Sequence, residues 1–401
     1  MMIFEFEDAP TQSARMRVVG VGGAGGNAVN RMIDEDLEGV EFISANTDAQ
    51  ALKNSQSHHT IQLGKKLTRG LGAGGRPEIG RQAIAESEDE VRMLLEGADL
   101  VFITAGMGGG TGTGAAPIIG EIAREFGALT IGIVTRPFAF EGPRRRHQAE
   151  QGLAELKRAV DTMIVVPNDR LLSVVGKGTS FKNALKKADE VLLHATQGIS
   201  NLIQVTGEVN VDFADVRTIM SCRGAALMGS GFGEGENRAV EAAQEAVSSP
   251  LLDDVSIHGA HGVLINITGG MDLAIDEVTQ ISTIIQKEAG DEAEIIFGAV
   301  HDEALEGKIR VTVIATGFDV PREHVEEQVA RPDFRRPSVS RVRGWAEPQP
   351  QFQEDRRMAL VGAGAAEEGE VVPFQRPPER IVDRGQIGEL DIPTFIRRQM
   401  D

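Results

Sequence analysis

The sequence is poor in aromatic side chains, with no tyrosine and a single cysteine. Aromatic residues make up 4% of the 401 residues, so the core is predicted to consist of aliphatic side chains. Cys222 can form neither an internal disulfide nor a zinc cluster, which favours a reducing compartment. The acidic start of the chain lacks the features of a signal peptide, and no apolar run reaches membrane-spanning length. We therefore expect a cytoplasmic protein without direct membrane insertion.

Positive charge is scarce relative to negative charge. The formal net charge is −19 at pH 7, which would repel a phosphate backbone, so nucleic acid is not an expected partner. This charge does not exclude a small nucleotide held by backbone amides. No cluster of metal-ligating side chains is visible, and the sequence predicts no dedicated metal site within the protein.

The first part of the chain alternates strand-like runs with helical patterns. This rhythm predicts a parallel sheet covered by helices, in which ligands bind at the carboxyl ends of the strands. The expected strands are Met16–Val19, Glu41–Ala45, Leu100–Thr104, Leu129–Thr135 and Met163–Val166.

The second part predicts a long helix and a smaller domain. Apolar residues recur at helical spacing from Phe181 to Gln204, which indicates one mostly buried helix. Beyond it, helices at 236–247 and 275–289 and strands at 262–268, 294–300 and 309–316 predict an α+β domain. After about Phe318 the chain is rich in Arg, Pro, Gln and Glu, which is typical of a disordered linker. The predicted class is therefore α/β: a parallel-sheet nucleotide-binding domain, a central helix, a smaller α+β domain, a linker and a short tail peptide.

Three glycine runs carry the functional signal. Gly20–Gly26 (GVGGAGG) fits the GxGxxG pattern, which alone is weak because a dinucleotide enzyme would show it too. Gly108–Gly114 (GGGTGTG) lies between a strand and a helix expected to start near Gly114, with Pro117 in its first turn. Its glycines let the backbone approach an anion. The run Gly70–Gly75 would wrap a terminal phosphate, and three such loops favour a triphosphate over a dinucleotide.

Two alternatives stay open at this point. An NAD-dependent dehydrogenase could be built on GVGGAG, with Glu41 binding the ribose. The second alternative concerns the family resemblance described next: a relative that binds the nucleotide and regulates without forming filaments.

Several motifs in order resemble the FtsZ family, the tubulin-like GTPases of the bacterial division ring. GVGGAGGNAV resembles the first phosphate loop of that family, NTDAQAL the second, GGGTGTG the tubulin-family signature, and NVDFADVR the catalytic loop. The terminal DIPTFIRRQ is similar to the tail peptide of the family. The resemblance covers about Arg15 to Gly317 together with this tail.

The resemblance implies GTP and GDP as ligands, with Mg²⁺ held mainly by phosphate oxygens and water. The implied contacts in the glycine loops are Gly22, Gly23, Ala24, Gly25, Gly26, Asn27, Gly72, Ala73, Gly74, Gly108, Gly109, Gly110, Thr111, Gly112 and Thr113. Those around the sugar, the phosphates and the base are Glu141, Arg145, Asn168, Leu185 and Asp189. The Asp189 carboxylate would accept both guanine N1–H and N2–H, with Leu185 one helical turn earlier against the base. Pro143 stands where the family often has Lys or Arg, which would weaken one basic contact.

The catalytic residues implied by the resemblance are Asp212, Asp215 and Asn210. On local grounds alone, Asp212 is a good helix N-cap and Asp215 a favourable charge at the third helical position. The resemblance implies that both carboxylates also enter the nucleotide pocket of the next subunit, so that polymerisation activates GTP hydrolysis. Such a head-to-tail contact does not close and produces a filament.

The resemblance also implies an organisation and a set of partners. The predicted segments are a flexible N-terminus (1–14), a GTP-binding domain (15–180), the central helix (181–206), a C-terminal domain with the catalytic loop (207–318), a linker (319–388) and a tail (389–401). Asp391 to Gln399 would bind membrane-tethered division adaptors, and division-site regulators are further expected partners. The linker would span on the order of 45 Å, and filaments would assemble at the division site on the inner face of the membrane.

Overall fold

The structure is a computed structural model, and it describes residues 14–318 except 175–179, 205–210, 223 and 253–255. All of these residues belong to one compact unit. The expected N-terminal segment up to residue 13, Asn210, the linker and the tail peptide lie outside the described residues.

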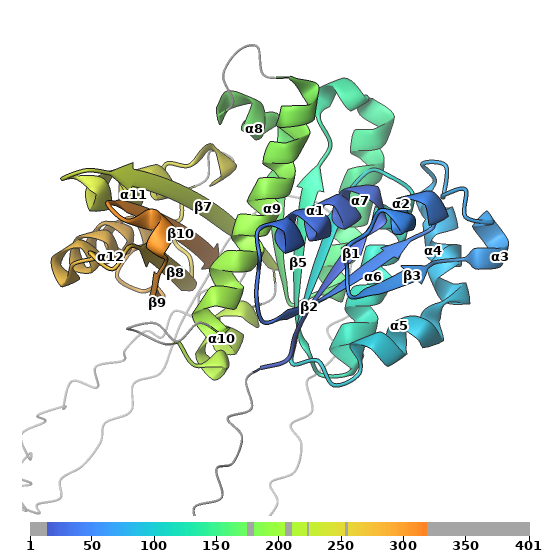
Figure 1. The fold of residues 1–401 in the computed structure, drawn as a ribbon, viewed down its shortest axis with the longest axis horizontal. Coiled ribbons are helices and arrows are strands. Elements are labelled where there is room, and N and C mark those ends of the chain that lie inside the picture. Colours follow the sequence, from blue (N-terminus) through green and yellow to red (C-terminus); the bar gives the residue numbers. More distant parts are fainter. Residues whose placement is uncertain (1–13, 175–179, 205–210, 223, 253–255, 319–401) are drawn as a thin grey trace, which may run out of the picture. The chain divides into compact units, whose positions relative to one another are not determined.

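A ten-stranded, largely parallel sheet organises the described chain (Figure 1). Its order is β3-β2-β1-β4-β5-β6-β7-β10-β8-β9, and the first seven of these strands run parallel to one another. β10 is antiparallel to both β7 and β8, while β9 is parallel to β8. The α/β prediction is thus confirmed. The strands are β1 Met16–Val21, β2 Val40–Asn46, β3 His59–Gln62, β4 Leu100–Gly106, β5 Leu129–Arg136, β6 Thr162–Pro167, β7 Gly224–Glu234, β8 Gly262–Gly269, β9 Glu294–His301 and β10 Lys308–Thr316.

Helices cover both faces of the strands β1 to β6. Val18 and Phe102 point into a core shared with α1 and α9, whereas the neighbouring Val19 and Ile103 point into a second core beneath α4 to α7. Strands buried on both faces read as continuous apolar runs, as the sequence does here. The helices of this part are α1 Gly22–Asp34, α2 Ala49–Lys53, α3 Lys65–Thr68, α4 Pro77–Glu86, α5 Glu88–Leu95, α6 Thr111–Glu125, α7 Pro143–Ala159 and α8 Asn168–Val174.

The long helix α9 spans Phe181–Gln204, as the periodicity predicts, and runs between the two groups of strands in Figure 1. Its 24 residues correspond to a length of about 36 Å. The short helix α10, Phe213–Met220, follows at its far end. Within the part of the chain that the structure describes, no helix has the length and apolar character that crossing a bilayer requires.

The sequence analysis does not predict strand β7. The glycines of this strand explain why it lies so close to a helix and why no apolar pattern marks it. A methyl group added at Gly229 or Gly231 would lie within about 2 Å of a carbonyl oxygen of the helix α11, Arg238–Val247. The helix therefore packs directly on a stripe of glycines, and its own buried face is formed by alanines. Together with α12, Ile275–Ala289, it covers a third aliphatic core on β8 and β10.

The start of α6 differs from the expectation. The helix begins at Thr111, inside the glycine run, and Pro117 lies within it. The predicted start near Gly114 is therefore wrong by one turn. Glycines at these positions allow close packing: a methyl group at Gly114 would lie 2.1 Å from the carbonyl oxygen of Pro77, so α4 and α6 are in direct contact there.

Candidate nucleotide site

The glycine runs and the polar residues after β5 and β6 lie at one edge of the sheet. Because the strands β1 to β6 are parallel, the segments that follow their carboxyl ends meet at this edge. α1 starts at Gly22 directly after β1, and α6 starts at Thr111 five residues after β4. Two helix N-termini, each favourable for an anion, therefore begin side by side.

Backbone contacts hold the three glycine runs together. A methyl group added at Gly22 would lie 3.0 Å from the nitrogen of Gly112, and one at Gly110 would lie 2.7 Å from the Cβ of Ala73. The Gly72 N–H donates to the Thr47 carbonyl oxygen at 3.2 Å. Gly25 packs equally closely against β4: a methyl group at Gly25 would lie 2.3 Å from the carbonyl oxygen of Thr104.

Other glycines of the same runs face open space. A methyl group added at Gly23, Gly26, Gly74 or Gly109 would meet no heavy atom within 4 Å. Next to α1 lies a cavity of about 210 Å³, and Gly23, Gly26 and Asn27 line it. Each run thus has closely packed glycines that fix its course and open ones that leave backbone accessible to a ligand. This is a suitable arrangement for binding phosphates through N–H groups.

The two threonines of the second run are engaged with the protein. The Gly108 N–H donates to Thr113 Oγ1 at 2.8 Å, and the hydroxyls of Thr111 and Thr47 lie 2.6 Å apart. Both threonine side chains are buried, at 9% and 2% exposure for Thr111 and Thr113. A hydroxyl that accepts one hydrogen bond can still donate another.

An ion pair lies beside the second glycine run. Glu141 and Arg145 are 2.9 Å apart, and Glu141 also accepts the Phe138 N–H at 2.8 Å. The carbonyl oxygen of Arg145 would lie 2.6 Å from a methyl group at Gly108, so the first turns of α7 adjoin this run. Pro143 is the first residue of α7.

Asn168 begins α8 at the carboxyl end of β6. Its side chain is 7% exposed, and its Oδ1 is buried without a hydrogen-bond partner among the described residues. A buried, unpaired amide oxygen costs stability in the free protein. Such an atom is well suited to accept a hydrogen bond from a ligand.

Leu185 and Asp189 project from α9, which packs against α1. The large apolar side chain of Leu185 is 41% exposed, whereas Asp189 is partly buried. Burial raises the pKa of the Asp189 carboxyl to about 6, although the charge of Arg31 on α1 opposes this shift. A carboxylate that has lost water without gaining donors can gain stability from a ligand that supplies N–H groups.

Asp212 and Asp215 lie at the opposite edge of the sheet. Asp212 caps α10 by accepting the Ala214 N–H at 3.2 Å, as expected from the sequence. Arg217 on α10 donates to the Gly127 carbonyl just before β5, and the Thr162 hydroxyl at the start of β6 donates to the Met220 carbonyl. α10 therefore lies at the amino ends of β5 and β6. The eight residues of β5 separate it from the glycine runs by about 26 Å.

Glu41 is also at the wrong edge for the role considered above. It is the second residue of β2, near the amino end, and it is paired with Arg17 at 2.6 Å and His59 at 2.9 Å. An acid that binds the ribose of a dinucleotide must follow the carboxyl end of that strand. This geometry argues against the dehydrogenase alternative.

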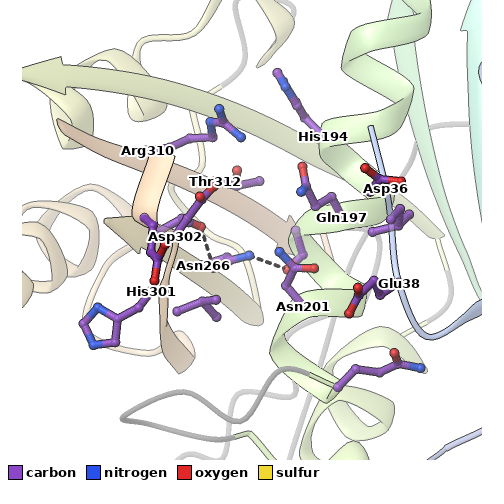
Figure 2. A pocket seen from close by; sticks show the side chains of 16 residues that line it. Asp36, Glu38, His194, Gln197, Asn201, Asn266, His301, Asp302, Arg310 and Thr312 are labelled. Atoms are coloured by element: carbon purple, nitrogen blue, oxygen red, sulfur yellow. Dashed lines mark hydrogen bonds between the residues drawn. The ribbon is translucent and has the colours of Figure 1, made fainter. Parts of the chain in front are cut away.

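Sequence reasoning missed a separate cavity of about 450 Å³ between α9 and the strands β8 and β10 (Figure 2). The Asn266 side chain donates to the Gly198 carbonyl at 3.0 Å and links β8 to α9 there. Burial, aided by the charge of Arg310, lowers the pKa of His194 to about 4, so this imidazole is uncharged at neutral pH. The residues that line this cavity come from segments distant in the sequence, so no local motif predicts it.

Comparison with known proteins identifies the family. Residues 15–176 match the Tubulin/FtsZ family, GTPase domain, and residues 224–319 match the FtsZ family, C-terminal domain. A solved structure of FtsZ from M. jannaschii, described as an empty dimer, is 45% identical with a TM-score of 0.75. The match covers 77% of this chain and 90% of that one. The chain belongs to the FtsZ family.

Other solved structures agree with this assignment. A mutant of M. jannaschii FtsZ is 46% identical, with a TM-score of 0.74 and coverage of 76% of this chain and 91% of that one. CetZ1 and CetZ2 from Haloferax volcanii are 21% and 24% identical, with TM-scores of 0.66 and 0.65, and show the shared fold alone. Each match covers 76% of this chain, together with 94% of CetZ1 and 93% of CetZ2. The resemblance to the FtsZ family is thus confirmed, and the chain carries a GTPase domain of this family.

Proposed function

We propose that this protein is a GTP-dependent polymerising GTPase whose head-to-tail filaments build the bacterial division ring. The separation of its two candidate half-sites carries the proposal. The glycine runs lie at the carboxyl edge of the sheet, and Asp212 and Asp215 lie at the amino edge. One subunit cannot bring both to the same phosphate. A second subunit stacked in the same orientation would present its amino edge to the nucleotide of the first.

The nucleotide is held from three directions in this proposal. The open backbone at Gly23, Gly26, Gly74 and Gly109 would receive the phosphates, together with the rest of the glycine residues named above. The Glu141–Arg145 pair and the unpaired Asn168 Oδ1 would contact the sugar and phosphates. Asp189 would accept two guanine N–H groups and Leu185 would cover the base. Adenine lacks that pair of donors.

Hydrolysis requires an oriented water and stabilisation of the charge on the γ-phosphate. The exposed carboxylates of Asp212 and Asp215 from the adjacent subunit would orient the water and accept its proton as it attacks the γ-phosphorus. Asn210, which lies outside the described residues, is proposed to assist. The loop N–H groups would stabilise the charge as the bond to GDP breaks.

Mg²⁺ would neutralise the charge of the β- and γ-phosphates. The described residues contain no group of three or more acidic, histidine or cysteine side chains arranged to hold a metal ion. The hydroxyls of Thr47 and Thr111 are neutral oxygens beside the glycine runs, and they suit an ion held mainly by phosphates and water.

The proposed location follows from the tail. Asp391 to Gln399 is proposed to bind membrane-tethered division proteins. The protein would then act in the cytoplasm, at the inner face of the membrane. The linker would provide reach, and division-site regulators remain proposed partners.

A mixing experiment tests the shared site. Asp212→Ala removes a proposed catalytic carboxylate. Gly109→Val places a side chain in the proposed phosphate site, at a position where an added methyl group meets no heavy atom within 4 Å. Each variant alone should release little phosphate from GTP with Mg²⁺. A mixture should regain activity, because the intact glycine runs of an Asp212→Ala subunit would meet the intact Asp212 of a Gly109→Val subunit. A mixture as inactive as its components, or wild-type turnover that is independent of protein concentration, would favour the non-polymerising alternative.

A further inference from the structure

A pocket lies beside the candidate nucleotide site, at the carboxyl edge of the sheet. It has a volume of about 330 Å³ and is lined by the last residues of β5 and β6 and by residues of α7 and α8. Of the residues assigned above to the nucleotide, only Asn168 lines it. Since a water molecule takes up about 30 Å³ of liquid, the pocket has the size of a small ligand with a few waters.

Three arginines from three different elements line this pocket. Arg136 is the last residue of β5, Arg146 lies on α7 and Arg170 lies on α8. The strand register pairs Arg136 with Pro167, the last residue of β6, so the two strand ends adjoin the pocket together. A guanidinium group carries five N–H donors and no acceptor. The pocket is therefore rich in donors that suit an oxyanion.

Two carboxylates share the pocket with these arginines. Glu150 contacts Arg136 at 3.2 and 3.4 Å, and Asp169 contacts Arg146 at 3.5 Å. The other oxygen of Asp169 accepts the Ala139 N–H at 2.9 Å, so the backbone helps to hold this carboxylate in place. The Arg146 side chain is 63% exposed, and such a long, exposed ion pair is weak. An anion can therefore bind Arg146 without displacing a strong partner.

The pocket belongs to a basic region of an acidic protein. From Arg136 to Glu150 the sequence contains four arginines and two glutamates, whereas the whole chain has a formal net charge of −19. A local excess of positive charge at a pocket attracts a compact anion. A phosphate presents three acceptor oxygens and can contact several guanidinium groups at once, whereas a carboxylate presents two oxygens. The arrangement therefore favours a phosphate group.

Asn168 connects this pocket to the nucleotide site. Its side chain is 7% exposed, and its Oδ1 has no hydrogen-bond partner among the described residues. This oxygen is an acceptor, so it suits a hydroxyl group rather than an anion. In the proposed function it contacts the sugar of the nucleotide. A phosphate bound by the arginines of the pocket would then lie beside that sugar.

We propose that this pocket is a second phosphate-binding subsite, in which Arg146 binds the anion together with Arg136 and Arg170. The phosphate can come from two sources: it is either free in solution or attached to a sugar hydroxyl of the bound guanine nucleotide. The second source rests on the proposed function, whereas the first does not. Glu150 competes with the anion for Arg136, so the charge of this glutamate limits the affinity.

The first arm of the test measures the binding of inorganic pyrophosphate to the full-length chain by calorimetry at constant ionic strength. All variants of this arm carry Gly109→Val, whose side chain enters the glycine runs and blocks phosphate binding there. Pyrophosphate should still bind. Adding Arg146→Gln should weaken binding about tenfold, because charge-assisted hydrogen bonds are lost.

Two further variants control for charge and for folding. Arg144→Gln makes the same charge change at an exposed residue of α7 that does not line the pocket, so binding should change less than about twofold, because salt screens distant charges. Glu150→Gln should strengthen binding, since it removes the competitor for Arg136. A gain in affinity cannot result from misfolding, and unfolding curves verify that each variant is folded.

The second arm compares GDP with guanosine 5′-diphosphate 3′-phosphate on the chain without Gly109→Val. If the phosphate is attached to the sugar, the 3′-phosphorylated nucleotide should bind about tenfold more tightly than GDP. Arg146→Gln should then remove this preference and leave the affinity for GDP unchanged. Failure of GDP to bind at all would contradict the proposed function and would leave the result of the first arm valid.

The two arms together can overturn the proposal. If Arg146→Gln changes neither pyrophosphate binding nor the preference for the 3′-phosphorylated nucleotide, the pocket is not a phosphate subsite. Equal losses with Arg146→Gln and Arg144→Gln would overturn it too, because the effect would then be one of overall charge. An effect of Arg146→Gln in the first arm alone would assign the subsite to free phosphate, and an effect in the second arm alone would assign it to a phosphate on the sugar.

Discussion

The raised pKa of Asp189 predicts how guanine nucleotide binding depends on pH. The free carboxyl titrates near pH 6 because burial disfavours its charge, and only the ionised form accepts both guanine N–H groups. Binding therefore favours loss of the proton and lowers the pKa of Asp189 in the complex. Affinity should be constant above about pH 7 and should decrease as the pH falls through 6.

The size of the effect follows from the same pKa. With a pKa of about 6, roughly one eleventh of the free protein carries the ionised carboxylate at pH 5. The affinity for GDP should then be about tenfold lower than at pH 7.5, or about 1.4 kcal/mol. Calorimetry at pH 6 in buffers of different ionisation enthalpy should show about half a proton released from Asp189 per GDP bound, because about half of the free carboxyl is protonated at this pH.

Asp189→Asn is the matched control for this experiment. The phosphates of GDP titrate in the same range, and both proteins share that contribution, so the difference between them isolates Asp189. The variant should also lose the preference for GDP over ADP. If wild type and variant show the same pH profile, Asp189 does not contact the base.

The remaining predictions concern catalysis, stability and the tail. Asp212→Ala should retain GTP affinity but lower phosphate release by about 10² to 10⁴, and normal turnover would remove Asp212 from catalysis. Gly231→Ala should lower the free energy of unfolding in urea by about 3 kcal/mol, since its methyl group would lie 2.0 Å from the Ala242 carbonyl oxygen. Gly26→Ala, with open space and a helical position, should instead raise it by about 0.5 to 1 kcal/mol while weakening GTP binding; equal effects of the two changes would contradict the packing argument. Deleting Asp391 to Asp401 should leave light scattering by filaments unchanged and abolish adaptor binding, and loss of scattering would place the tail in assembly.

Sequence patterns predicted those elements in which buried positions carry apolar side chains at a regular spacing. α9 and α12 agree with the structure at both ends, because each has a continuous apolar stripe at helical spacing. β7 was missed because its inward positions are glycines, which carry no apolar signal although they are packed against α11. The start of α6 was placed too late because glycines are poor helix formers, and here tertiary contacts with α4 outweigh that preference.

The candidate site was only partly predictable for a similar reason. The location of the glycine runs could be predicted, because each follows a strand and the carboxyl ends of parallel strands meet at one edge of the sheet. The position of Asp212 depends on the length and direction of α9, which no local motif contains. The expected strand Glu41–Ala45, in contrast, already places Glu41 at an amino end. The unpaired oxygen of Asn168 is likewise visible only once its neighbours are placed.

The length of the helix α9 has a further consequence for the proposed site. The helix carries Asp189 near one end and leads to Asp212 beyond the other, so its length sets the offset between the base contact and the carboxylate. One residue inserted within α9 would advance the end of this helix by about 1.5 Å and rotate it by about 100° relative to Asp189. In the proposed filament, a one-residue insertion in α9 would change this offset in every subunit and so misalign all of the interfaces at once.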